Sequence, residues 1–398
     1  MKILEGSTSH ELFKEIERHT ERSLMDKGRR SLLQAGALTA GYLLPAACGQ
    51  DVIADLELLD RLRKAVKQPT TIDDPLLGLL TSGTQHFRKH FVLARNSLED
   101  LLSCHHDLTV HVHRLTDLLT SSLPPSVRRS LSQVTAEALQ VLGDLAFHLG
   151  QDGLAEHAYV LAFDLAGESE HPVLQAVLLG RRGIFFLYQQ HPHEGVTVLE
   201  HAFLLATTHG ASDLICAWLS ALLAECYAQE GQKDDCQQQL ARAQALLERQ
   251  APGRTTLSFE GEAPYLPFNR ERFLGYQAAC LLRLGLAREA EEILKQLLPT
   301  DGQVAAHRRS IRLLDLTMAL VQQRRLEEAV SWGLEGLKSL EQTRSPRVLE
   351  RALQVEQRLN RWREERLLTP LMEYLAHLKR SIPHGQSSPP DPEGRRAG

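Results

Sequence analysis

The sequence is poor in aromatic residues and in long β-branched runs, and it has no large excess of charge. Phe, Trp and Tyr make up 5% of the 398 residues. Leu and Ala are abundant, which favours helices because unbranched side chains lose little rotamer freedom in a helix. The formal net charge is −5 at pH 7, so electrostatics gives no reason to expect that the chain as a whole binds nucleic acid.

Motifs of metal and catalytic chemistry are also missing. The six cysteines form no CxxC pair, which excludes a zinc ribbon and a thioredoxin-like motif. We expect buried, reduced thiols, and Cys226 and Cys236 are the two that could approach each other within one repeat. The chain has no Walker loop, no GxGxxG, no GxSxG and no kinase motifs. We therefore predict a protein that is not an enzyme and carries no cofactor.

Histidines raise the question of a metal site. His86 and His90 are four residues apart on a predicted helix, and residues 104–107 with His111 and His113 lie on the next one. Two histidines at that spacing share a helix face and could bind a metal. There is no HExxH motif, so we predict no metal site and expect partly exposed helix histidines.

The N-terminal residues allow two interpretations. Residues 1–28 predict an amphipathic helix, and a twin arginine then leads the apolar stretch 29–50. A twin arginine, an apolar core and small residues before Cys48 are typical of a Tat export signal with a lipoprotein-like end. However, Pro45 replaces the branched apolar residue of such a signal, and the run is short for a membrane span. We favour a buried hinge helix in a cytoplasmic protein, with export as the alternative.

The next segment, 51–130, predicts an N-terminal helical cap. Leucines at helical spacing are followed by a turn that places Pro75 at the first position of a helix. Two helices are predicted here, over 75–102 and over 107–119.

Beyond this cap the sequence repeats itself. Five small residues recur at steps of 40, 41, 54 and 39 residues: Gly143, Gly183, Ala224, Ala278 and Thr317. A second small residue follows each of them at a constant spacing: Ala155, Gly195, Cys236, Ala290 and Ala329. A larger side chain comes four residues later in four of the five units: Tyr159, Leu199, Leu240 and Leu294. This periodicity is typical of paired helices that stack as repeats.

The spacing has a physical reason. Two antiparallel helices pack closely only if small side chains occupy their crossing point and large ones fill the groove beside it. Each pair buries only part of its apolar surface, so neighbouring pairs must stack. Residues 131–345 are therefore predicted to form an all-α, right-handed superhelical solenoid of tetratricopeptide-like helix pairs, interrupted by a long loop at 250–270. Capping helices are predicted over 346–380, and a disordered tail over 381–398.

The first helix of each pair lines the concave surface of such a superhelix. Polar and aromatic side chains there could clamp a carboxylate or a peptide backbone. The candidates are Arg181, Arg182, Tyr188, Trp218, Glu225, Asn269, Arg272 and Arg283, with Phe147 beside them. For each arginine alone, the alternative is solvation or pairing with a nearby Glu. We expect a peptide or a partner protein as ligand, no membrane association, and leave a homodimer open.

Three stretches resemble the sensor half of bacterial Cro/repressor-type helix-turn-helix regulators that carry tetratricopeptide repeats. RRSLLQAGALTAGYLLP at 29–45 resembles the hinge segment that follows the DNA-binding domain of that family. Residues 142–169 resemble its first strong repeat, and residues 266–285 its long-loop-to-helix element. The resemblance implies the ligand-sensing part of a cytoplasmic transcriptional regulatory system.

The chain departs from this family before the twin arginine. There the family has a complete DNA-binding domain, whereas this sequence has 28 residues. A helix-turn-helix fold does not fit into that length, so we do not expect direct binding to nucleic acid. The sequence is then either a stand-alone sensor or a chain that starts inside a longer reading frame.

Overall fold

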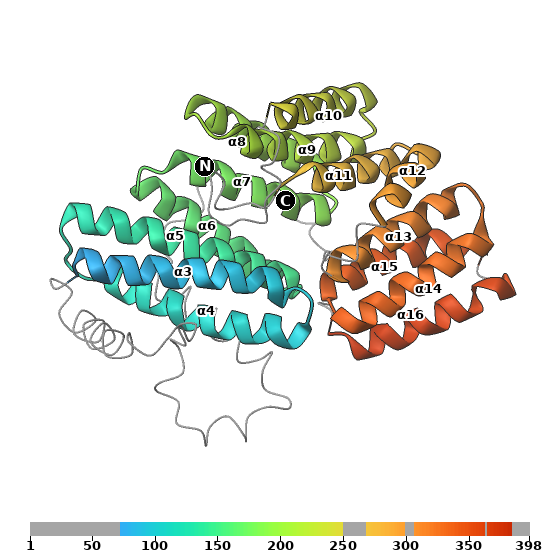
Figure 1. Ribbon diagram of the computed structural model, residues 1–398, viewed down its shortest axis with the longest axis horizontal. Helices are drawn as coiled ribbons and strands as arrows, with labels where there is room; N and C mark the ends of the chain where they lie inside the picture. Colours follow the sequence, from blue (N-terminus) through green and yellow to red (C-terminus); the bar gives the residue numbers. More distant parts are fainter. Residues whose placement is uncertain (1–71, 250–267, 299–305, 363, 384–398) are drawn as a thin grey trace, which may run out of the picture.

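The computed structural model describes residues 72–249, 268–298, 306–362 and 364–383 (Figure 1). Within these ranges the secondary structure is helical and contains no strand. In chain order the helices are α3 (Asp74–Ala94), α4 (Leu98–Leu119), α5 (Pro125–His148), α6 (Asp152–Glu168), α7 (Pro172–Tyr188), α8 (Pro192–Thr208), α9 (Asp213–Gln229), α10 (Lys233–Glu248), α11 (Arg270–Arg283), α12 (Ala287–Leu297), α13 (Ala306–Gln322), α14 (Leu326–Thr343), α15 (Pro346–Leu359), the 3-10 turns η3 (Asn360–Trp362) and η4 (Arg366–Leu368), and α16 (Thr369–Ser381).

Several predictions concern residues outside these ranges. They include the helix at 1–28, the hinge or signal at 29–50, most of the loop at 250–270 and most of the tail at 381–398. These stay predictions, as does the choice between a cytoplasmic and an exported protein. Among the helices that are described, none is long and apolar enough to cross a membrane.

The helices pack as consecutive pairs. α5 packs on α6, α7 on α8, α9 on α10, α11 on α12 and α13 on α14, and each pair also contacts the next. Figure 1 shows the pairs arching from α3–α6, through α7–α12, to α13–α16. The predicted all-α solenoid of tetratricopeptide-like helix pairs is confirmed in this part of the chain.

Within a pair, the helices approach each other at the predicted small residues. A Cβ on Gly143 would lie 2.5 Å from the Tyr159 ring, and a Cβ on Gly183 would lie 2.5 Å from Cγ of Leu199. Tyr159 and Leu199 are the larger side chains that the repeat pattern places at this crossing, and both are buried. The sequence periodicity therefore reflects a direct contact, in which a glycine makes room for the large residue of the second helix.

The turn inside each of the five pairs has the same backbone conformation. One residue per turn has a positive φ: Gly150, Gln190, Gly231, Gly285 and Arg324. The residue after it makes the same hydrogen bond in each turn, since the Gln151 amide donates to the Ala146 carbonyl at 2.9 Å and the Arg325 amide donates to the Leu320 carbonyl at 3.0 Å. This is the Schellman pattern that ends a helix with a left-handed residue.

The predicted helix over 75–102 is wrong, because the structure breaks it. α3 ends at Ala94 and α4 begins at Leu98. Ser97 has an extended backbone, and its Oγ accepts a hydrogen bond from the Asp100 amide at 3.3 Å. Such an N-cap starts a new helix, but apolar residues continue on both sides of the break and conceal it in the sequence.

Two other helix boundaries differ from expectation. α5 begins at Pro125, so the expected start of the repeats at 131 falls inside this helix. At the end of the predicted capping helices over 346–380, the structure has the short turn η4 followed by α16, with Pro370 in the first turn of α16. Proline is favoured at that position because its missing amide would have no helical partner there.

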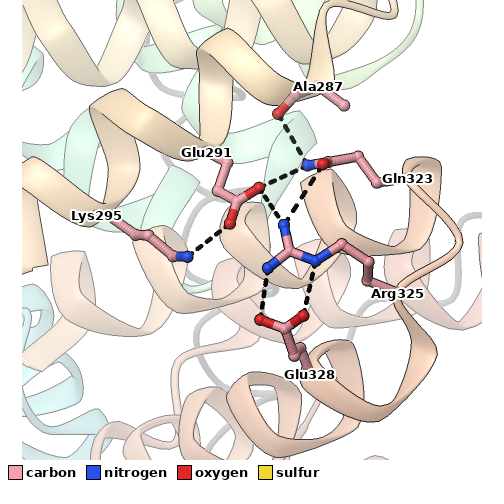
Figure 2. A network of polar contacts seen from close by, with 6 residues as sticks. All are labelled: Ala287, Glu291, Lys295, Gln323, Arg325 and Glu328. Atoms are coloured by element: carbon pink, nitrogen blue, oxygen red, sulfur yellow. Dashed lines mark hydrogen bonds and ion pairs between the residues drawn. The ribbon is translucent and has the colours of Figure 1, made fainter.

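A polar network fixes the fourth pair against the fifth (Figure 2). Glu291 of α12 accepts hydrogen bonds from Gln323 at 2.7 Å and from Arg325 at 2.6 Å, and it pairs with Lys295 at 2.6 Å. Arg325 also binds Glu328 at the start of α14. Burial favours a higher pKa for Glu291, but these donors outweigh it and lower the pKa to about 2. The carboxylate therefore stays ionised and holds the α13–α14 turn on α12.

The buried apolar residues form two clusters that meet at α11. The first extends from α3 to α11 and includes Phe273 and Cys280, whereas the second extends from α11 to α16 and includes Ala278 and Leu282. Opposite faces of this one helix thus belong to different cores.

Gly183→Ala should destabilise the protein, because the added Cβ has no space beside the buried Leu199. We expect a loss of about 1–2 kcal/mol in the free energy of unfolding, measured by urea denaturation. Gly275→Ala in α11 is the matched control, since nothing lies within 4 Å of its Cβ position. There the change should stabilise by about 0.5–1 kcal/mol. Equal effects at the two sites would contradict the packing rule.

Arg324→Gly should stabilise the protein. Arg324 is exposed and has a φ of 61°, a conformation that costs an L-residue roughly 1 kcal/mol and glycine almost nothing. We expect a gain of about 1 kcal/mol in the same denaturation experiment. The same change at the exposed Arg288, inside α12, should instead cost about 1 kcal/mol. A loss of stability in Arg324→Gly would rule out the shared turn geometry.

Candidate ligand-binding face

Polar and aromatic side chains from the first helices of the pairs lie close together on one side of the array. We call this side, which carries Asp144, His148, Arg181, Tyr188 and Arg272, the inner face. On α5, Gln140, Asp144 and His148 are spaced four residues apart and share one side of the helix. Asp144 accepts hydrogen bonds from Gln140 and from the Tyr159 hydroxyl, each at 2.7 Å, and pairs with Arg181 of α7 at 3.1 Å. Asp144 therefore orients Arg181 on the inner face.

Trp218 is a supporting residue rather than a ligand contact. It is 1% exposed, and a Cβ on Gly180 would lie 2.5 Å from its ring. The Arg181 guanidinium lies 5.5 Å from the centre of the Trp218 ring. The sequence expectation that Trp218 faces a ligand is thus corrected, because close helix packing at Gly180 draws the indole into the core.

The two ends of the array are joined by Arg347 of α15. This buried side chain donates from Nε to the Phe147 carbonyl of α5 at 2.9 Å, across 200 residues of sequence. It also pairs with Asp152 and with Glu350. Its guanidinium lies 4.0 Å from the centre of the Phe147 ring and 5.2 Å from that of Tyr188. Phe147 and Tyr188, which the sequence analysis placed near a groove, therefore lie where the array closes.

A ring contact next to this closure links α3, α5 and α13. The His148 and His307 ring centres are 4.9 Å apart, Phe91 lies 5.4 Å from His148, and the Arg95 guanidinium lies 5.2 Å from the Phe91 ring. Burial, followed by the nearby arginine charges, lowers the pKa of His307 to about 3. The pKa of His148 is also far below its usual value, because of burial and of His307. Both imidazoles are neutral at physiological pH.

Several inner-face groups are surrounded by protein and still contact solvent. Tyr188 is 38% exposed, yet burial raises its pKa to about 12. Arg272 and Tyr276 are half-buried, and burial lowers the pKa of Arg272 to about 10 and raises that of Tyr276. Side chains that line a concave surface are expected to behave in this way, because protein surrounds them while part of each side chain still reaches solvent.

The remaining candidates are held by local partners. Glu225 and Arg283 form an ion pair at 2.8 Å, and Arg182 lies 4.0 Å from Glu156 of α6. Arg283 and Arg182 thus fit the alternative stated in the sequence analysis, in which an arginine pairs with a nearby Glu instead of facing a ligand. Asn269 caps α11, because its Oδ1 accepts the Arg272 amide at 2.9 Å. The cap fixes the start of the helix that carries Arg272.

Sequence reasoning missed Asp144, His148, His307 and Arg347, and it missed Arg95. A usable signal existed only on α5, where polar residues four apart interrupt an otherwise apolar helix. Arg95 lies in the break between α3 and α4 that was taken as continuous helix. The other contacts join residues that are far apart in sequence, and no local pattern marks them.

The histidines of α3 and α4 differ in part from the expectation of partial exposure. His105 and His111 are buried, and burial lowers the pKa of each to about 4. His111 Nε2 lies 2.9 Å from the Thr84 hydroxyl. The expectation was wrong for these two residues because they face the α3–α5 packing. In the described part of the chain, no group of three or more His, Cys, Asp or Glu is arranged to hold a metal ion.

The described cysteines are buried and free, as expected. Cys236 and Cys280 of the next pair are close enough for each thiol to shift the pKa of the other, whereas Cys226 packs where a Cβ on Gly195 would lie 2.8 Å from its sulfur. The approach of Cys226 to Cys236 stays a prediction.

Comparison with solved structures finds several similar chains, and the one named below has low sequence identity. No family model matches the chain, and no curated protein matches its sequence. A solved structure that it resembles is the crystal structure of a Rap protein complexed with competence and sporulation factor, with 12% identity and a TM-score of 0.47, covering 82% of this chain and 98% of that chain. Similarity at this level carries no functional inference for the present chain.

Arg347→Met should open the array. The change keeps much of the side-chain volume but removes the bonds to Phe147 and Asp152, so we expect a loss of about 3 kcal/mol in unfolding free energy. The radius of gyration in small-angle X-ray scattering should increase. Arg344→Met is the control, because Arg344 is exposed and donates to the Ser381 carbonyl. An unchanged radius of gyration for Arg347→Met would show that Arg347 does not close the array.

Proposed function

We propose that this chain is a peptide-binding module whose ligand lies on the inner face of the solenoid. The observation that carries the proposal is the convergence of half-buried polar and aromatic side chains from α5, α7 and α11. His148, Arg181, Tyr188, Arg272 and Tyr276 all retain solvent contact there.

These groups match the needs of an extended peptide. Its backbone carbonyls and carboxylates require donors, which Arg181 and Arg272 supply, and its apolar side chains require ring faces such as Tyr188. Asp144 holds Arg181 in place at 3.1 Å, and the Tyr188 ring packs against Phe147. Groups fixed in this way lose little conformational entropy on binding, which favours affinity.

We further propose that binding is a sensing event in a bacterial transcriptional regulatory system, as the resemblance in sequence implies. Tyr188 contacts both Phe147, at 5.0 Å between ring centres, and the guanidinium of Arg347. A ligand that packs on Tyr188 therefore interacts with the contact that closes the array. A difference in affinity between closed and open forms would shift the balance between them.

The test selects ligands from a display library of short random peptides with the purified full chain. Enriched peptides should bind the wild type, and Tyr188→Ser should weaken them at least about tenfold, because aromatic anchors dominate such contacts. Leu204→Ser is the control, since Leu204 is 64% exposed on α8, and it should change binding less than about twofold.

Hydrogen exchange of the wild type with and without an enriched peptide gives a readout that does not depend on the stability of a variant. Protection should appear in α5, α7 and α11. Failure to enrich any peptide, or protection confined to the second helices of the pairs, would overturn the proposed function.

A further inference from the structure

Two histidines meet where the first and the fifth pairs of the array approach each other. His148 lies at the end of α5 and His307 near the start of α13. Their ring centres are 4.9 Å apart and their planes are inclined at 72°. His307 is 4% exposed, and the Nδ1 atoms of both rings are buried without a hydrogen-bond partner among the described residues. The contact therefore joins distant parts of the chain through two imidazoles whose Nδ1 atoms have no acceptor.

This contact lies beside the one that Arg347 makes. The ring centres of Phe147 and His148 are 5.7 Å apart, and the Arg347 guanidinium lies 4.0 Å from the centre of the Phe147 ring. One side chain from α13 and one from α15 thus meet neighbouring residues of α5. The closure of the array depends on both contacts.

The charged groups around the two rings come from α3, α5, α7, α11, α13 and α15. The Phe91 ring lies 5.4 Å from His148 and 5.2 Å from the Arg95 guanidinium. The arginine charges that act on one or both rings are those of Arg95, Arg181, Arg272, Arg308 and Arg347. Two of them, Arg181 and Arg308, have partners of their own.

Asp144 is the carboxylate one helical turn before His148 on α5. Its oxygens already accept hydrogen bonds from Gln140 and Tyr159, and it pairs with Arg181. A proton on His148 would therefore meet a carboxylate whose positions are taken.

A proton added to either ring would be unfavourable in the closed array. A neutral imidazole donates from one nitrogen, whereas an imidazolium donates from both. Protonation would leave a donor at a buried Nδ1 without an acceptor, and two charged rings would repel each other at 4.9 Å. Once α5 and α13 separate, water can solvate both rings, so proton uptake favours the open array.

We propose that the contact between His148 and His307 is a pH-sensitive closure, which holds the array shut while both rings are neutral and opens it when they take up protons in mild acid. The closure requires no ligand, so this inference does not rest on the proposed function.

The sign and size of the effect follow from the two protonation equilibria. In the closed array the pKa of each ring is lowered from the ordinary value of 6.5, to about 3 for His307, first by burial and then by the neighbouring charged groups. Each neutral ring therefore favours closure fully above about pH 6.5 and progressively less as the pH falls. Between about pH 7.5 and about pH 5.5, each ring should shift the equilibrium about tenfold towards the open form, and both together about 100-fold.

Small-angle X-ray scattering of the full chain at these two pH values tests the closure. The radius of gyration should rise in mild acid, while the helical signal in circular dichroism stays unchanged. The rise should be absent in the double variant His148→Phe with His307→Phe, because phenylalanine rings can pack in the same place and take up no proton. His106→Gln with His201→Gln is the matched control. Both of these histidines are exposed, and this variant should expand as the wild type does.

Three results would overturn the inference. They are an equal expansion of the double phenylalanine variant, a constant radius of gyration of the wild type down to about pH 5, and an expansion accompanied by loss of helix. The last would indicate acid unfolding, to which the buried His105 and His111 of α4 contribute.

If the double phenylalanine variant does not fold at neutral pH, His307→Gln replaces it. This change removes one of the two titrating rings, so the shift between the two pH values should fall from about 100-fold to about tenfold. A shift as large as that of the wild type would contradict the closure. Peptide selection at neutral pH tests the proposed function separately, and its failure would leave the pH response unaffected.

Discussion

The close contact between the two helices of a pair governs both the fold and the site. Gly143 lets the Tyr159 ring lie against the backbone of α5, and this position brings the Tyr159 hydroxyl 2.7 Å from Asp144. Asp144 in turn holds Arg181 on the inner face. The packing contact that defines the repeat therefore also places a charged group of the site, because a bulkier residue at 143 would displace the ring and the hydroxyl together.

The packing of the two helices within a repeat could be predicted from the sequence, whereas the contact that joins the two ends of the array could not. The spacing of Gly143, Gly183 and their partners predicted the helix pairs, because each contact lies within one repeat of about 40 residues. The contact of Arg347 with Phe147 joins the ends of the array. It depends on the small rotations between all the intervening pairs, which no single motif encodes. The break at Ser97 was hidden because a one-residue cap is a weaker signal than continuous apolar spacing.

The positions of the candidate site residues were predicted in part, and the errors have a common cause. Helical position placed Arg181, Tyr188 and Arg272 on the first helices correctly. It could not show that Arg283 is neutralised by Glu225 at 2.8 Å or that Trp218 is drawn into the core. Nor could it reveal Arg95 and His307, which reach the inner face from outside the set of predicted groove residues. Accessibility and pairing depend on neighbouring helices, whereas periodicity describes one helix at a time.

Because α11 contributes side chains to both cores, it determines how a movement in one half of the array affects the other half. Phe273 belongs to the core on the N-terminal side, and Leu282 belongs to the core on the C-terminal side. Because these residues belong to one helix, α11 cannot move without displacing side chains of both cores, so a change in one half of the arch is passed on to the other.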